Sequence, residues 1–138
     1  MAALTDNRMS PSKGDIKRVD RFLMANSTTI YAGSLVMINS SGLATPAIAS
    51  AANKGVVGVA IEKKTSGTGG NDWVQVAVGK FRMGAVSIAQ ANVGSLMYAL
   101  DDQTVDETQL LNQPVAGTLV EFISSTDGWF LIGPEFNG

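Results

Sequence analysis

The chain contains two copies of one pattern of short β-type segments, and this internal repeat limits its possible folds more than any other feature. Three segments of the first half match three of the second half, in the same order: AGSLVM at 32–37 with VGSLMY at 93–98, GVAIE at 58–62 with GTLVE at 117–121, and WVQV at 73–76 with WFLI at 129–132. The spacing between partners falls from 61 to 59 to 56 residues, as expected for shorter loops in the second copy. One such unit alone exposes an apolar face, so the repeat predicts two units packed around a β core.

The residues between these matches favour strands and hairpins over helices. Aromatic and β-branched residues occur in short runs, and turn clusters such as NSSG at 39–42 separate them. The expected strands cover 31–38, 43–46, 56–62, 73–78, 80–88, 96–100, 117–124 and 129–132. We therefore predict a mainly β fold, a compact, tulip-like β-sandwich or barrel over residues 25–138, with degenerate repeat halves at about 29–80 and 90–134.

Residues 1–24 differ from the rest of the chain, and we predict that they form an extended N-terminal arm. Five Lys and Arg against three Asp give this segment a net charge of +2, whereas the remainder carries −4. A disordered terminus and a short helix over 14–24 are the alternatives. The residues expected to bind a partner are the basic and apolar side chains of the arm: Arg8, Met9, Lys13, Lys17, Arg18, Arg21, Phe22 and Leu23.

The expected partner of the arm is an acidic protein surface. Nucleic-acid-binding segments usually have a denser run of Lys and Arg than these diluted charges. No stretch approaches the roughly 20 apolar residues of a membrane span, and the first ten residues lack the apolar run of a signal peptide. We expect a soluble protein, made in the cytoplasm, that binds neither nucleic acid nor membrane.

The 138 residues include no His and no Cys, which excludes much of enzyme chemistry. Ser-His-Asp triads, imidazole acid–base catalysis, thiol nucleophiles and metal sites with His or Cys ligands are all ruled out. The GTGG loop at 67–70 leads into a strand and lacks the Gly-Lys-Ser/Thr of a P-loop, which favours a hairpin tip. The acidic residues between 101 and 107 lack the glycine of a calcium loop, which favours a solvated turn.

Two pairs at matching repeat positions could also carry chemistry. Glu62 with Glu121 could act as paired carboxylates, and Trp73 with Trp129 could form a sugar-stacking platform. Strand-end and core-edge packing is the simpler interpretation for both pairs. We therefore expect no catalytic, cofactor-binding or metal-binding residues, and no cofactor.

From about residue 31 to 133 the sequence resembles the capsid decoration, or cement, proteins of tailed phages. The resemblance lies in AGSLVMINSSG, in GVVGVAIEKKTSGTGG followed by WVQVAVGKF, and in VGSLMYALDDQTVD leading to AGTLVEF. Ser34 and Ser95 depart from the family, which often has Asp after the Gly, and the arm is longer than in compact members. The resemblance implies a non-enzymatic, β-rich homotrimer on the outside of a phage head that braces the major capsid protein.

Other functions remain open at this point. One alternative is another virion β-module, such as a tail-tube, head-completion or fibre-base protein, and the other is a carbohydrate-binding module. A ring rather than a trimer would indicate the first, and glycan binding by the isolated chain would indicate the second. An enzyme is disfavoured by the missing His and Cys.

Overall fold

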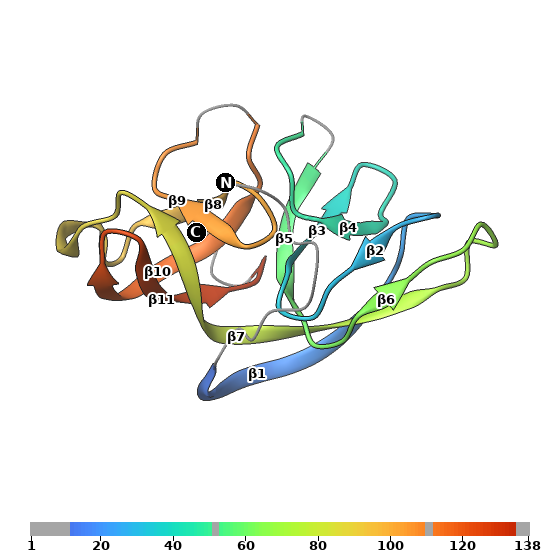
Figure 1. Cartoon of the computed structure of the whole chain (residues 1–138), viewed down its shortest axis with the longest axis horizontal. Coiled ribbons are helices and arrows are strands. Elements are labelled where there is room, and N and C mark those ends of the chain that lie inside the picture. The colour runs from blue at the N-terminus through green and yellow to red at the C-terminus, as the bar shows by residue number, and fades with distance from the viewer. Residues whose placement is uncertain (1–11, 51–52, 110–111, 135–138) are drawn as a thin grey trace.

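One 14-residue strand, β7 (Trp73–Val86), runs through both lobes of the molecule and connects them (Figure 1). The computed structural model describes residues 12–50, 53–109 and 112–134, and for residues 12–15 only the backbone. The N-terminal lobe contains β1 (Ser12–Leu23), β2 (Thr29–Ile30), β3 (Leu35–Asn39), β4 (Ala44–Pro46), β5 (Asn53–Ala60), β6 (Lys64–Thr65) and the first half of β7. The C-terminal lobe contains the rest of β7, the 3-10 helix η1 (Gln90–Asn92), β8 (Leu96–Ala99), β9 (Thr104–Asp106), β10 (Val115–Ser124) and β11 (Asp127–Ile132).

The C-terminal lobe is a closed β-barrel. Its strands pair in the order β7-β11-β10-β8-β9 and return to β7, where β9 pairs in parallel from Gly84 to Val86. The N-terminal lobe has the corresponding order β1-β7-β5-β3-β4, but a single bridge between Met24 and Ala44 joins its ends. The fold is thus mainly β, as predicted.

The strand pairing of the N-terminal lobe recurs in the C-terminal lobe. β3, β4 and β5 correspond to β8, β9 and β10. When 61 is added to the residue numbers of β3 and β4, and 59 to those of β5, their residue pairs become the pairs of the corresponding strands. Backbone hydrogen bonds follow the same rule: Gly33 donates to Ala60 at 2.8 Å, and Gly94 donates to Leu119 at 2.8 Å. Both glycines have positive φ, 88° and 92°, which explains why the sequence keeps Gly there.

Two features of the expected repeat differ from this pattern. The recurring unit includes β1. Val19 of β1 pairs with Ala77 of β7, and at the equivalent position of the C-terminal lobe Lys80 of β7 pairs with Leu131 of β11. The halves therefore divide inside β7, near residue 79, and the expected strands 73–78 and 80–88 form one continuous strand. The tryptophan match is also two residues out of register, since the structural counterpart of Trp129 is Gln75.

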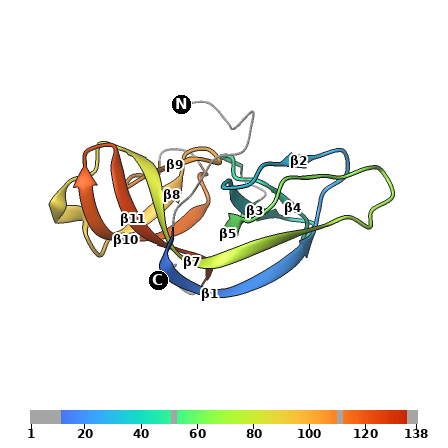
Figure 2. The ribbon, with the colours of Figure 1, turned by 60° about the horizontal axis from the view of Figure 1, so that its bottom comes forward.

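The N-terminal arm predicted for residues 1–24 is wrong from residue 12 onward. Residues 12–23 are strand β1, which pairs antiparallel with β7 and lies along it on the outside of the N-terminal lobe (Figure 2). The helix considered for 14–24 is likewise wrong, because these residues are extended and pair with β7 along the strand. Residues 1–11 lie outside the described residues.

Two apolar cores explain the continuous apolar runs of β3 and β5. In β3, Val36 and Ile38 enter the core of the N-terminal lobe, whereas Leu35 and Met37 join the core of the C-terminal lobe. Strands buried on both faces have no polar side to show, so their sequences read as unbroken apolar runs. The outer face of β3 thus holds the two lobes together.

Gly58 and Gly117 occupy equivalent positions where backbones come too close for any side chain. A Cβ at Gly58 would lie 2.5 Å from the Ala77 carbonyl oxygen, and one at Gly117 would overlap the carbonyl oxygen of Leu131. Such an overlap with rigid backbone cannot be relieved by a rotamer change. This close approach accounts for the glycine at the start of both GVAIE and GTLVE.

The first prediction concerns these glycines. Gly58→Ala and Gly117→Ala should each lower the free energy of unfolding by about 1–3 kcal/mol, the usual cost of overpacking. Gly84→Ala is the matched control, because its Cβ would meet the nearest atom at an ordinary 3.6 Å. Urea unfolding followed by circular dichroism measures the effect. If the three variants were equally stable, the close-approach argument would be wrong.

The second prediction concerns β1. Deleting residues 1–24 should unfold the N-terminal lobe, since it removes β1 from β7 and takes away Met24, which is 1% exposed in the core. Deleting residues 1–11 leaves the β1–β7 pairing in place and should preserve cooperative unfolding. Thermal unfolding and amide dispersion in NMR spectra distinguish the two variants. If the variant that lacks residues 1–24 kept native amide dispersion, these residues would form a detachable arm, as the sequence predicts.

Candidate partner-binding surface

The structure places the expected partner-binding residues in three different situations. Arg8 and Met9 lie outside the described residues, and only the backbone of Lys13 is described, within β1. Lys17, Arg18 and Arg21 are exposed on β1, where Arg18 pairs with Asp20 at 2.6 Å. These cations are therefore carried on a rigid strand and not on a flexible arm.

The two expected apolar anchors, Phe22 and Leu23, lie on opposite faces of β1, and only Phe22 packs against the chain's own core. Phe22 is half-buried and packs against the N-terminal core, opposite Val74 of β7. Leu23 is half-buried as well, opposite Trp73. The apolar area of Phe22 thus stabilises the chain's own N-terminal lobe, whereas Leu23 lies on the outer face beside Trp73.

Apolar side chains are instead exposed on a face that β1, β5 and β7 share. Val19, Arg21 and Leu23 lie opposite Ala77, Gln75 and Trp73. Residues directly opposite in an antiparallel pair share a face, and Ile61 joins it because its N–H donates to the Gln75 carbonyl at 3.2 Å. Val19, Ile61 and Trp73 are 49%, 44% and 41% exposed. We call Val19, Arg21, Ile61, Trp73 and Gln75 the β1–β7 face.

Arg21 is stacked on Trp73 at the centre of the β1–β7 face. The guanidinium carbon lies 4.4 Å from the centroid of the indole ring, which is a cation–π distance. The guanidinium thus lies over an apolar support, and the Arg21 side chain remains exposed to solvent. Tryptophan and arginine are the residue types that most often dominate binding energy at protein interfaces.

The corresponding place in the C-terminal lobe holds an ion pair. Arg82 corresponds to Arg21, and Asp127 corresponds to Trp73. The Arg82 Nε donates to both carboxylate oxygens of Asp127, at 3.1 and 3.0 Å, and its Nη2 donates to one of them at 2.5 Å. These hydrogen bonds and the attraction between the charges raise the pKa of Arg82 above its ordinary value.

The two tryptophans do not form a platform. Trp73 is exposed at the start of β7, whereas Trp129 is 9% exposed and lies opposite Arg82 in the other lobe. Trp129 thus lies beside position 82 of β7, which is nine residues along the strand from Trp73, or up to roughly 30 Å. Glu62 and Glu121 are also divided between the lobes, and a carboxylate oxygen of Glu62 accepts the backbone N–H of Gln75 at 3.2 Å.

The acidic residues of the β8–β9 region mostly stabilise turns. The carboxylates of Asp101 and Asp106 accept the backbone N–H groups of Gln103 and Thr108 at 3.0 and 3.2 Å. Asp102 is 2% exposed, so the expected solvated turn is wrong for that residue, whose carbonyl accepts the Leu35 N–H across the lobes. Among the described residues, no three Asp or Glu side chains lie close enough to hold a metal ion.

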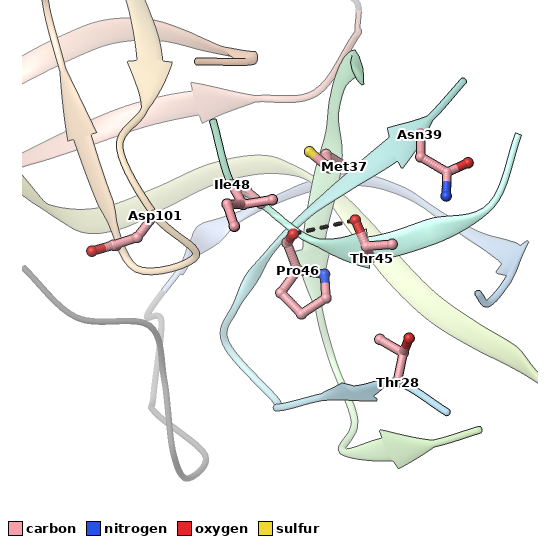
Figure 3. A pocket seen from close by; sticks show the side chains of 8 residues that line it. Thr28, Met37, Asn39, Thr45, Pro46, Ile48 and Asp101 are labelled. Carbon is pink, nitrogen blue, oxygen red and sulfur yellow. Dashed lines mark hydrogen bonds between the residues drawn. The ribbon is translucent and has the colours of Figure 1, made fainter. Parts of the chain in front are cut away.

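A cavity of about 590 Å³ lies where β3, β4 and the segment after β4 meet the β8–β9 turn (Figure 3). Its lining is largely apolar and consists of Thr28, Met37, Asn39, Thr45, Pro46, Ala47, Ile48 and Asp101. The Asp101 carboxylate points away from Ile48, and the Thr45 hydroxyl is turned to the Pro46 carbonyl at 3.3 Å (Figure 3). The cavity can receive an apolar group, but its side chains do not converge on a polar ligand.

Comparison with protein-family models, curated proteins and solved structures finds no significant match to this chain. The resemblance to phage decoration proteins therefore depends on the sequence motifs alone. Within the described ranges, no helix has the length and apolar character needed to cross a membrane.

The third prediction concerns the ion pair. Asp127→Asn should lower the melting temperature at low ionic strength, because it leaves the Arg82 guanidinium without its charged partner. The difference from the wild type should shrink in 1 M salt, since exposed charges are screened over about 3 Å there. Asp106→Asn is a control at the half-buried last residue of β9, whose carboxylate accepts the backbone N–H of Thr108. A difference that is independent of salt would contradict an electrostatic role.

Proposed function

We propose that this chain is a structural virion protein that binds the outer surface of a phage capsid and stabilises the lattice of the major capsid protein. The observation that carries this proposal is the β1–β7 face, where Val19, Ile61 and Trp73 remain exposed beside a stacked arginine on an otherwise well-packed β body. Exposed apolar surface with a polar component is typical of protein-binding sites. The choice of a phage capsid as the partner comes from the sequence motifs that resemble those of phage decoration proteins.

A decoration protein acts by binding and not by catalysis. A molecule that binds only the assembled lattice lowers the free energy of that state, by about 2.7 kcal/mol per site at a free concentration one hundred times the Kd. Rigid strands suit this task, because a side chain on a strand loses little additional freedom on binding. The proposal includes a homotrimer on the capsid and no enzymatic activity, cofactor, nucleic acid or membrane partner.

The alternative of another virion β-module remains compatible with a two-lobed β fold. A tail-tube or head-completion protein would assemble into a ring, whereas a decoration protein would trimerise on threefold positions. The carbohydrate-binding alternative is less well supported, because Trp129 is buried and Arg21 covers one face of Trp73.

The fourth prediction tests the proposed function. The chain should sediment with empty capsids assembled from the major capsid protein encoded beside its gene, and it should not sediment with unassembled subunits. Decorated capsids should also withstand higher temperatures before they disassemble, as mass action requires. Absence of a capsid gene in the neighbourhood, or absence of cosedimentation, would contradict the proposal.

A further inference from the structure

Pseudo-symmetry between the lobes indicates what the β1–β7 face lacks. Arg21 and Arg82 occupy equivalent positions on equivalent strands. Arg82 holds the carboxylate of Asp127, whereas the position of that aspartate is taken in the N-terminal lobe by Trp73. Within the described part of the chain, Arg21 is paired with no carboxylate. The N-terminal lobe thus presents an arginine in a carboxylate-binding position, with an aromatic support in place of the carboxylate.

The guanidinium of Arg21 is also held ready to bind. Stacking on Trp73 at 4.4 Å restricts its plane, so less side-chain freedom is lost when a ligand arrives. A guanidinium has five N–H donors and binds a carboxylate through two parallel hydrogen bonds. Because Arg21 is exposed, these donors are available to a ligand from outside the molecule.

The residues around Arg21 favour a ligand that carries an apolar group beside its carboxylate. Val19 lies two residues away on the same strand and face, and Ile61 lies beyond Gln75 on the other side of β7. Both are more than two-fifths exposed. A ligand that brings an apolar side chain next to its carboxylate would cover them, and a bare carboxylate would not.

We propose that Arg21 and Trp73 form a receptor for an Asp or Glu side chain on a partner protein, flanked by apolar residues of that partner that pack on Val19 and Ile61. The inference depends on the proposed function in so far as the partner there is the capsid lattice. It goes further by assigning the contact to this face and by giving the chemistry of the segment that docks on it.

A foreign protein fits this face better than a second copy of the chain. Several carboxylates of this chain already have local partners: Asp20 pairs with Arg18, Asp72 accepts the Gly67 N–H at 2.9 Å, and Asp127 pairs with Arg82. Each of these three carboxylates in a second copy would have to break its local contact to reach Arg21, whereas an unengaged carboxylate on another protein would not.

The experiment uses two blocked peptides that differ in one charge, acetyl-Gly-Leu-Asp-Leu-Gly-amide and its Asn counterpart. They are titrated into the full ¹⁵N-labelled chain while the Trp73 indole N–H and the Arg21 Nε–H are followed by NMR. The Asp peptide should shift both resonances with saturation, and the Asn peptide should bind roughly two- to fivefold more weakly, as for a partly exposed charge pair. Arg21→Gln should remove the difference between the peptides, and Arg21→Lys should restore part of it.

Arg82→Gln is the matched control, because it alters the equivalent arginine, which already has its carboxylate. It should keep the preference for the Asp peptide. The inference is wrong if neither peptide binds, if both bind equally to the wild type, or if Arg21→Gln retains the preference. It is also wrong if Trp73 shifts with protein concentration alone and Arg21→Gln abolishes self-association, since the face would then be an interface between copies.

Cosedimentation with capsids separates this inference from the proposed function. If the wild type binds capsids and Arg21→Gln binds them equally well, the function stands and the assigned surface is wrong. If the peptides behave as expected and the wild type does not bind capsids, the receptor stands and the capsid is not its partner.

Discussion

The structure depends on β7, a single strand whose backbone is shared by the two lobes. Its residues pair with β1 and β5 in the N-terminal lobe and with β11 and β9 in the C-terminal lobe. Buried N–H and C=O groups must be paired, and the two halves of β7 are paired mainly by strands of their own lobes. The lobes are coupled through the continuity of β7 and through the outer residues of β3, which pack into the second core.

The two lobes close to different extents around the shared strand. Three parallel residue pairs join β7 to β9, whereas one bridge, Met24 to Ala44, does the same in the N-terminal lobe. β1 is correspondingly important there, because it is the strand that carries the bridge and covers the N-terminal core. A duplicated pattern has thus retained its strand pairing while its closure and its outer face have diverged.

The sequence predicts the β class, most strands and the equivalence of Gly58 with Gly117, because strand-type residue runs and the repeated GVAIE and GTLVE motifs can be recognised along the chain. It fails at β1, whose charged residues resemble a solvated arm until the edge of β7 is known to need a partner. It also misaligns the tryptophans by two residues, since Trp73 and Trp129 match by residue type while strand register is set by distant partners. Arg21 was among the predicted site residues, but its stacking on Trp73 joins residues 52 positions apart and leaves no pattern in the sequence.

Arg21 and Arg82 have different partners, so the two lobes present different outer faces, which suits a protein that binds through one face. In the C-terminal lobe the charge is neutralised internally and the neighbouring Trp129 is 9% exposed, so that lobe offers little reason for a carboxylate-bearing partner to dock there. In the N-terminal lobe the equivalent arginine rests on an exposed indole between two exposed aliphatic side chains. Fully desolvated arginine contacts stabilise complexes far more than exposed ones. Because only one of the two equivalent arginines can gain that energy, a protein partner that docks on it would hold the molecule in a single orientation.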